Sequence, residues 1–405
     1  MLSFLQTAKY FFELTNWFIV YMYFNRTKQI AQIMELPKVK LPAKIPFSFG
    51  KKKKARKVAA LDIGSFGVKL VEVLFDEKDN ATLVKTGFRS LAVGTIVDKD
   101  IRDREGLVFA IQNLVDEVDP EITEVGFSLA GHKVLVDKVQ VPAPTGKGNR
   151  ENQIREAVMV EAEQRIPTGI DSVQLDFVEL GPTEDGKKIN VLLIAARNEL
   201  VEDYLGVVMD AGLVPVVIDL DSIALYNAFE FNHGIPQEGG IALVNVGHSL
   251  TNMAFILNGS LFSVRDISNA ARSVWDRLQT ELHLSTDDLK ELMVGNIPLE
   301  ESPSTRRAVS NATEDLGIGI GMAFSYFENM TNGAKIEKVY MSGGAVGIPF
   351  LVDSLAQKLN LPIELINSFG KIKFDPSMFE GKNLDLVRGI NTVGIGVAIR
   401  TKEIV

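Results

Sequence analysis

Two short turns carry the side chains in this sequence whose types and spacing could bind phosphate. The first lies in VAALDIGSFGVKLVEV, residues 58–73, where an apolar run breaks at Asp62 and resumes after Gly67. Glycine in a hairpin tip lets backbone N–H groups converge without obstruction by Cβ, which forms a cradle for phosphate oxygens. The predicted nucleotide-binding residues of this turn are Asp62, Gly64, Ser65, Phe66, Gly67 and Lys69.

Each polar side chain of this turn has an expected role. Ser65 adds a hydroxyl donor, and Lys69, seven residues after Asp62, lies far enough along the returning strand to reach back to the phosphates. The Asp62 carboxylate is placed to hold Mg²⁺ through a water molecule. A turn of this kind alone is more often an ordinary hairpin, so the interpretation needs further elements.

A second turn repeats the pattern 183 positions later, in VNVGHSLTNMAFIL, residues 244–257. Asn245 takes the place of Asp62, and the hydroxyls of Ser249 and Thr251 are further donors. Two facing hairpins of this kind would clamp a nucleotide tail from both sides, and the repetition predicts two similar halves. The predicted nucleotide-binding residues here are Asn245, Gly247, His248, Ser249 and Thr251.

A third glycine turn follows in KVYMSGGAVGIPFLVDSLAQKL, residues 338–359. Gly343 and Gly344 separate a strand from a helix that is expected to start at about Pro349. A glycine pair at such a turn lets a planar base or a ribose approach the backbone. The sequence therefore predicts an adenosine contact at Gly343 and Gly344.

The elements around these turns indicate an α/β protein. Strand-like runs such as KVAALDIG, VLLIAAR and IALVNVG alternate with helical periodicity, as at Leu107, Ile111 and Leu114. A second helix is expected to begin at a cap, Asn198, and to stop at Gly212. With 405 residues, two or more domains are expected.

Composition excludes several classes of protein. The chain has no cysteine, which excludes disulfides and thiolate metal sites, and its four histidines are too scattered for a zinc enzyme. Residues 58–405 are acidic, which argues against nucleic acid as the main partner.

The N-terminal region differs in charge from this body. Residues 34–57 carry nine Lys or Arg against one Glu, which is typical of a mobile linker that either contacts an anionic membrane surface or is simply solvated. Residues 1–33 contain an aromatic run too short to span a membrane, and they are either an interfacial anchor or not translated.

Longer stretches resemble the PilM family of type IV pilus assembly, which is related to FtsA within the actin-like ATPase superfamily. The resemblance covers residues 47–400 and is carried by AVMVEAEQRIPTGIDSVQLDFVEL, VLLIAARNELVEDYLGVVMDAGLVPVVIDLDSIAL, LNGSLFSVRDI and SGGAVGIPFLVDSLAQKLNLPIELINSF. The family's helix with two glutamates before Ile-Pro is matched at Glu161, Glu163, Ile166 and Pro167.

This resemblance implies an actin-like, duplicated ribonuclease H-like fold: two halves around a nucleotide cleft, with an FtsA-type IC subdomain. The implied division is a flexible N-terminal segment and linker (1–57), half I (58–87 and 182–235), the IC-like subdomain (88–181) and half II (236–400). It also implies ATP and Mg²⁺ as cofactors.

The implied role is that of a cytoplasmic scaffold, peripheral at the inner membrane. It would bind the N-terminal tail of a PilN-like bitopic membrane protein, contact the pilus platform and motor proteins, and possess some capacity for self-association. An FtsA-like cell-division protein and a type II secretion platform component are the alternatives.

Departures from the family concern catalysis. Asn245 stands where relatives usually have Asp, so hydrolysis is expected to be weak or absent, and Phe66 stands where a small residue is usual. A sugar-kinase-like enzyme would need a general base, for which Asp219 and Asp221 are the candidates. The structural alternative for both is a carboxylate at a strand end, with Asp221 capping the next helix.

Overall fold

The computed structural model describes residues 55–145, 148–183 and 185–404, so the predicted aromatic segment and most of the basic linker lie outside the described residues. Arg56 and Lys57, predicted to end the linker, already belong to the first strand, β1. Within the described ranges, no helix has both the length and the apolar character needed to cross a bilayer.

The first half is built on a sheet of order β10-β6-β1-β2-β3-β16. β1, β2 and β3 form an antiparallel meander, and β6 and β10 continue it in parallel. The strand bounds are β1 Arg56–Ile63, β2 Gly67–Phe75, β3 Ala81–Ser90, β6 Glu124–Leu129, β10 Val214–Leu220 and β16 Ile372–Lys373; a small hairpin is formed by β4 Ile96–Val97 and β5 Asp100–Ile101.

The second half repeats this order in the sheet β13-β12-β11-β14-β15. Its first three strands again form an antiparallel meander, and the last two are again parallel to the central strand. The predicted duplication is thus confirmed at the level of topology. The bounds are β11 Gly240–Val246, β12 Thr251–Leu257, β13 Ser260–Ile267, β14 Ile336–Ser342 and β15 Ile363–Leu365.

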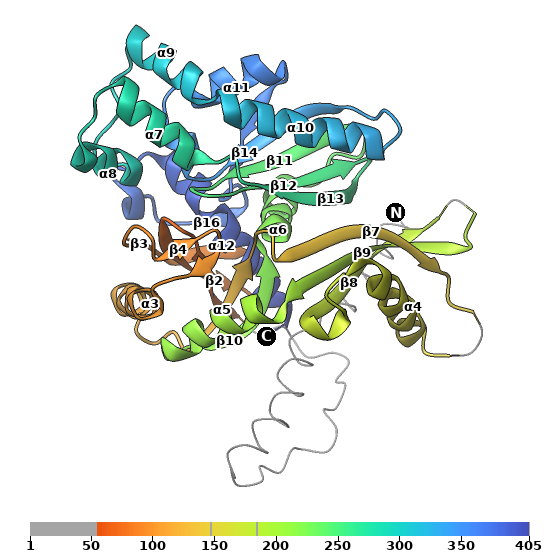
Figure 1. The fold of residues 1–405 in the computed structure, drawn as a ribbon. Coiled ribbons are helices and arrows are strands. Elements are labelled where there is room, and N and C mark those ends of the chain that lie inside the picture. The colour runs from red at the N-terminus through yellow and green to blue at the C-terminus, as the bar shows by residue number, and fades with distance from the viewer. Residues whose placement is uncertain (1–54, 146–147, 184, 405) are drawn as a thin grey trace.

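Helices and sheets alternate in five layers (Figure 1). Alternation of buried residues along β1 directs Leu61 to the helices α3 and α5, and Ala60 to α6 and α12. α6 also packs on the second sheet, whose other face is covered by α7, α9, α10 and α11. The bounds are α3 Arg104–Val118, α5 Asn198–Asp210, α6 Asp221–His233, α7 Ala271–Glu281, α8 Thr286–Val294, α9 Pro303–Ala312, α10 Glu314–Met330, α11 Leu351–Leu359 and α12 Leu384–Ile404; the 3-10 turns η2 and η3 span Gly344–Gly347 and Pro376–Phe379.

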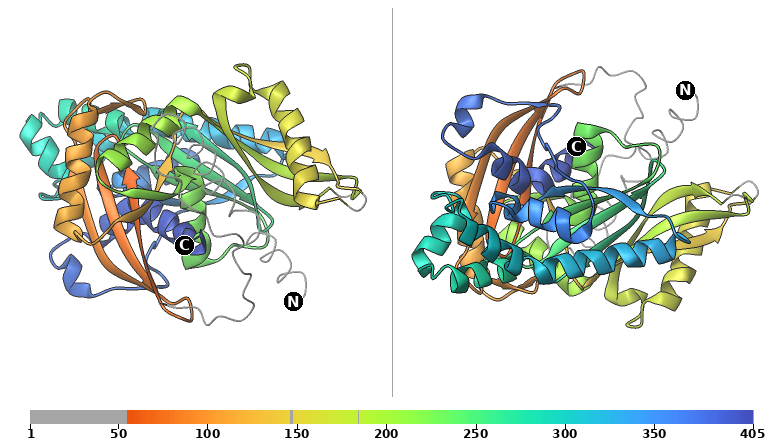
Figure 2. Two further views of the ribbon diagram at one scale, coloured as in Figure 1. Left: turned by 90° about the horizontal axis from the view of Figure 1, so that it is seen from below. Right: turned by 90° about the horizontal axis from the view of Figure 1, so that it is seen from above.

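A small subdomain projects from one side of this body, as both views in Figure 2 show. Its sheet has the order β7-β9-β8 and packs on α4. The bounds are β7 Val134–Pro142, α4 Arg150–Arg165, η1 Ile170–Ser172, β8 Val173–Pro182 and β9 Lys188–Arg197. These elements span residues 134–197, whereas the family resemblance implied a subdomain at 88–181.

The chain also crosses back between the halves near its end. β16 pairs with β3 of the first sheet, and α12 packs on β1, β2 and α6. Residues 236–400, predicted as half II, therefore include elements that complete the core of half I. Local sequence patterns do not reveal this return, because the apolar face of α12 suits either sheet.

Two predicted helix caps are wrong. Asn198 is the first residue of α5 rather than its cap, because its side chain bonds Gln174 and the Asp171 carbonyl instead. Asp221 is the first residue of α6 and forms no capping bond either. Both side chains have tertiary partners that a local cap pattern does not disclose.

Candidate functional site

The two predicted turns form two-residue hairpin tips of the same geometry. In the first, the amide of Gly64 donates to the carbonyl of Gly67 at 3.1 Å. In the second, the amide of Gly247 donates to the carbonyl of Leu250 at 3.0 Å. The tips are therefore Ser65-Phe66 and His248-Ser249, at the ends of the β1–β2 and β11–β12 hairpins.

The fold brings these tips into direct contact. The hydroxyls of Ser65 and Ser249 are hydrogen-bonded at 2.6 Å, and the rings of Phe66 and His248 lie 5.4 Å apart between centroids. Phe66 also stacks on Phe88 of β3, at 5.9 Å. We call the two contacts between the tips, the Ser65–Ser249 hydrogen bond and the Phe66–His248 ring contact, the tip latch. Phosphate placed between the tips has to separate them.

Unpaired donors at the tips fit an anion. Within the described ranges, the backbone N–H groups of Ser65, Phe66, His248 and Ser249 have no hydrogen-bond acceptor. In the same ranges the buried Nδ1 atom of His248 also lacks a partner. Burial and the nearby Arg272 lower the pKa of His248, so its imidazole is neutral at pH 7. Amides that converge in this way suit phosphate oxygens.

Beneath the first tip, Asp62 and Lys69 form a cross-strand ion pair. Their carboxylate and ammonium groups lie 2.9 Å apart, and Asp62 is buried. Gly64 lies directly above this pair: a Cβ at Gly64 would lie 3.5 Å from the Lys69 amine.

The second tip has an uncharged counterpart of this pair. Asn245 and Asn252 occupy the corresponding cross-strand positions, with Asn245 Nδ2 donating to Asn252 Oδ1 at 3.2 Å. Asn245 Oδ1 accepts a bond from the Ser342 hydroxyl, and Asn252 donates to Asp266. The Asn245 amide is buried, and its nitrogen and its oxygen each make one hydrogen bond within the protein.

Three other predicted residues lie close by and take part in local structure. The hydroxyl of Thr251 is buried and donates to the carbonyl of Asn269 at 2.7 Å, so it is not free for phosphate. Gly343 has a φ of 97°, and a Cβ there would lie 2.3 Å from the Val246 carbonyl. Gly344 begins the η2 turn, and α11 starts at Leu351, two residues after the predicted start at about Pro349.

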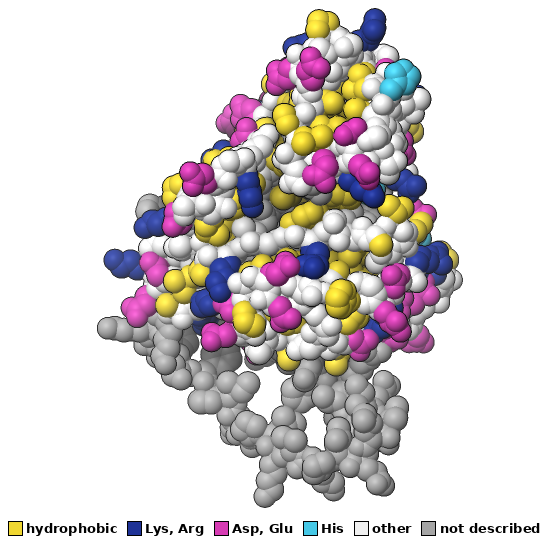
Figure 3. Space-filling view, turned by 90° about the vertical axis from the view of Figure 1, so that its left-hand side faces the viewer, with side chains coloured by type: hydrophobic (Ala, Val, Ile, Leu, Met, Phe, Trp, Pro, Cys, Tyr) yellow, Lys and Arg dark blue, Asp and Glu magenta, His cyan; other side chains and the backbone are white. Residues whose placement is uncertain are grey.

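A cleft of about 1360 Å³ opens beside the tips, between the two halves. The face seen in Figure 3 is hollowed there. Ser65, Phe66, His248 and Ser249 line this cleft, whereas Asp62, Lys69, Asn245, Gly343 and Gly344 lie outside its wall. Residues that the sequence analysis missed complete the lining, among them Phe88, Arg272, Lys290, Asn383 and Leu386. The space is ample for a nucleotide.

Behind the cleft lies a buried ion pair between Lys99 and Asp221. The Lys99 amine is 3.2 Å from Asp221, whose other oxygen accepts a bond from Ser128 at 2.6 Å. Burial lowers the pKa of Lys99, but Asp221 and other anionic neighbours outweigh that effect and raise it. Asp221 is therefore committed to structure, and the general base of a kinase is not available in this carboxylate.

Asp219, the other candidate base, is held by the Leu220 amide and by Asn227. Burial raises the pKa of Asp219 to about 6. As the pH rises from 4, the Asp219 carboxyl therefore loses its proton in the unfolded chain before it does so in the folded protein. The free energy of unfolding falls over this range and levels off above about pH 6.

Replacing Asp219 with Asn is expected to remove this dependence. The free energy of unfolding of the wild type, minus that of Asp219→Asn, should fall by about 1–3 kcal/mol between pH 4 and pH 7. Urea unfolding of both proteins at several pH values measures the difference. A constant difference across this range would contradict the burial of a titrating carboxyl at this position.

The architecture and the paired turns define the class of protein. Two ribonuclease H-like halves with the same strand order, facing each other with a glycine turn from each, constitute an actin-like fold. Residues 60–402 match the family described as Type IV pilus assembly protein PilM, and the chain belongs to this family.

Comparison with solved structures gives the following similarities. The chain is similar to one in the PilM-PilN type IV pilus biogenesis complex, with 24% identity, a TM-score of 0.71, and coverage of 85% of this chain and 98% of that one. It also resembles the ethanolamine utilization protein EutJ from Carboxydothermus hydrogenoformans, with 12% identity, a TM-score of 0.49 and coverage of 86% and 91%. MreB5 of Spiroplasma citri bound to ADP is 12% identical, with a TM-score of 0.46 and coverage of 86% of this chain and 97% of that one.

Proposed function

We propose that this chain is a nucleotide-binding scaffold of the type IV pilus inner-membrane platform. It binds ATP in the cleft, and it holds the N-terminal tail of a PilN-like membrane protein at the cytoplasmic face of the inner membrane. Family membership supports the pilus role and does not favour an FtsA-like or type II secretion protein. The meeting of the two tips, each with free N–H groups, is the observation that supports phosphate binding.

In this proposal the tip amides hold the phosphate oxygens, and Ser65 and Ser249 exchange their mutual bond for bonds to phosphate. Lys69 supplies positive charge from below, and Asp62 holds Mg²⁺ through water. Bound Mg²⁺ would neutralise phosphate charge. Among the described residues, no three acidic or histidine side chains gather around one point, which suits a single outer carboxylate better than a direct protein cage.

Binding without efficient hydrolysis is the form of this function that the site supports. A water molecule must be oriented for attack, and the second turn offers for this only a neutral amide whose two ends are already bonded. The nucleotide then acts as a structural ligand that stabilises one arrangement of the two halves. Self-association and contacts with platform and motor proteins belong to the same proposal.

Partner capture is supported by the fold. The match to the chain from the PilM-PilN complex covers 98% of that chain, and the small subdomain, residues 134–197, falls within the matched family range. The PilN-like tail is therefore proposed as the partner, without an assigned contact set.

Calorimetry on the full chain tests the binding of the tail peptide and of Mg-ATP, and a phosphate-release assay tests hydrolysis. The expected results are binding of a peptide that copies the N-terminal tail of the neighbouring bitopic protein, binding of Mg-ATP, and phosphate release no faster than from Asp62→Asn. Absence of tail binding at high micromolar concentration would overturn the scaffold assignment, and sustained phosphate release would overturn the non-hydrolytic form.

The tip latch gives a further expected result. Replacing Phe66 with Ala removes its tilted ring contact with His248, worth about 1 kcal/mol, together with its stacking on Phe88, and leaves the backbone amide in place. Because phosphate must part the tips, the variant should bind Mg-ATP about fivefold more tightly. Titration with a fluorescent ATP analogue measures this, and weaker binding would mean that the ring supports the nucleotide rather than the closed tips.

A further inference from the structure

The helix α7, whose residues are all described, begins in a way that local rules disfavour. Its cap position holds Ala270, whose side chain cannot accept a hydrogen bond, and its first turn holds a cation, Arg272, and no acidic residue. Side-chain acceptors and acidic groups stabilise this end of a helix, because its amides lack partners and carry partial positive charge. A local rule broken in this way often marks a functional position.

Two carbonyls of the second turn take the place of the missing cap. The amide of Ala271 donates to the Gly247 carbonyl at 3.0 Å, and the amide of Arg272 donates to the His248 carbonyl at 2.8 Å. Because the Cα–Cβ bonds of a helix tilt toward its N-terminus, the Arg272 side chain leaves α7 toward its tip end. After burial, the charge of Arg272 is the next cause that lowers the pKa of His248, as expected of a guanidinium close to that imidazole. Arg272 and His248 line the same cleft.

The ion pair that Arg272 forms within the chain is weak. Its Nε atom lies 3.9 Å from Oδ2 of Asp276, and the two side chains are 63% and 67% exposed. Exposed pairs of this kind contribute little, and a cation placed before its anion along a helix is the less favourable order. Asp276 lines the cleft as well, so an anion that enters there meets a negative charge that Arg272 can offset.

We propose that Arg272 is a further phosphate-binding residue of the cleft, which leaves Asp276 and pairs with the nucleotide phosphates when they enter between the tips. Guanidinium groups bind phosphate through directed, charge-assisted hydrogen bonds. Lys69 then acts from beneath the first tip and Arg272 from beside the second, so each half contributes a cation. This inference rests on the nucleotide binding proposed above and adds to it one ligand, Arg272, and one internal competitor, Asp276.

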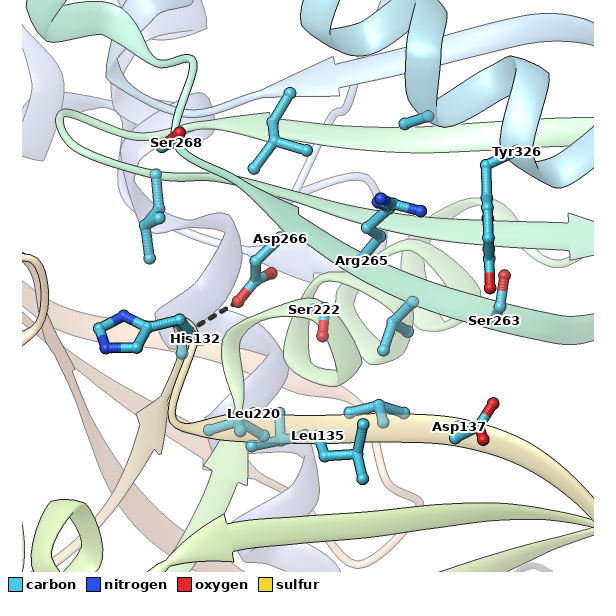
Figure 4. Close-up of a pocket in the computed structure, with 18 of the residues that line it drawn as sticks. His132, Leu135, Asp137, Leu220, Ser222, Ser263, Arg265, Asp266, Ser268 and Tyr326 are labelled. Carbon is cyan, nitrogen blue, oxygen red and sulfur yellow. Dashed lines mark hydrogen bonds between the residues drawn. The ribbon is translucent and has the colours of Figure 1, made fainter. Parts of the chain in front are cut away.

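Titration of the full chain with a fluorescent ATP analogue and Mg²⁺ tests this role. Arg272→Gln should weaken binding about tenfold, the loss expected for one charge-assisted contact. Asp276→Asn, which removes the competitor, should tighten binding about two- to threefold. The matched control is Arg265→Gln in the same half. Arg265 lies over the Tyr326 ring at 4.5 Å in a separate pocket of about 770 Å³ (Figure 4), so this variant should bind like the wild type.

Two further measurements distinguish a phosphate contact from support of the local structure. The inhibition constant of adenosine, which has no phosphate, should be the same for the wild type and Arg272→Gln when adenosine competes with the analogue. The affinity for Mg-ATP should fall less steeply with added KCl in Arg272→Gln, because one ion pair with phosphate is missing and salt screens such pairs. An equal loss of affinity for adenosine and for Mg-ATP would overturn the proposed phosphate contact.

The wild type separates the failure of this inference from that of the proposed function. A wild type that binds no Mg-ATP would overturn nucleotide binding and the role of Arg272 together. A wild type that binds Mg-ATP no more tightly than Arg272→Gln would overturn the role of Arg272 alone. Weaker binding by Asp276→Asn than by the wild type would contradict the competition between Asp276 and the phosphates.

Discussion

Replacing Lys99 with Met is expected to lower the free energy of unfolding by about 3–5 kcal/mol, because it leaves the buried Asp221 carboxylate without its counter-charge. Both side chains of this pair are at most a tenth exposed. Lys99 is held in place from outside the pair as well, since its carbonyl accepts a bond from the buried hydroxyl of Tyr204 at 3.2 Å. Chemical denaturation of the wild type and Lys99→Met measures the effect.

The double variant Lys99→Met/Asp221→Leu separates structure from catalysis. If the pair is structural, removing both charges should cost less than removing Lys99 alone, because no buried ion is left unpaired. Bound nucleotide should be retained in both proteins that fold. A double variant less stable than Lys99→Met would mean that Asp221 has favourable contacts beyond the ion pair, for which Ser128 is the candidate.

The sequence predicted those features that depend on local order. The α/β pattern, the duplication and both hairpin tips follow from short apolar runs interrupted by glycine. The strands on either side of the two tips, β1, β2, β11 and β12, lie where these runs predict them. Gly212, with a φ of 85°, follows the end of α5 as expected. Apolar runs, glycine turns and helix ends can be recognised from neighbouring residues alone.

Features that depend on tertiary contacts were not predictable in the same way. Asp221 has the local pattern of a helix cap, and nothing near it in the sequence reveals its partner Lys99, which lies 122 positions away on a small turn. Phe88, which supports Phe66, reads only as one apolar residue of a strand. The Ser65–Ser249 bond joins two hydroxyl residues of the two turns, and the repeat does not reveal that they are in contact. These contacts follow from how the two sheets face each other.

Replacing Asp62 with Asn is expected to weaken Mg-dependent ATP binding by at least tenfold. The substitution keeps the volume of the side chain but removes the charge that orders Mg²⁺-bound water and that pairs with Lys69. Loss of one charge-assisted interaction costs about 1.5–3 kcal/mol, which corresponds to about 10- to 100-fold in affinity. Calorimetric titration with ATP in the presence of Mg²⁺ gives the affinity.

The same titration with excess EDTA distinguishes the two roles of Asp62. If the carboxylate acts through Mg²⁺, the wild type and Asp62→Asn should differ with the metal and converge without it. If its main role is to position Lys69 for the phosphates, the difference should persist in EDTA, and Lys69→Gln should reproduce it. The variant Asn245→Asp supplies the matched test in the other half: it should restore a carboxylate to the equivalent cross-strand position, and a gain in phosphate release there would assign the missing catalytic function to that single amide.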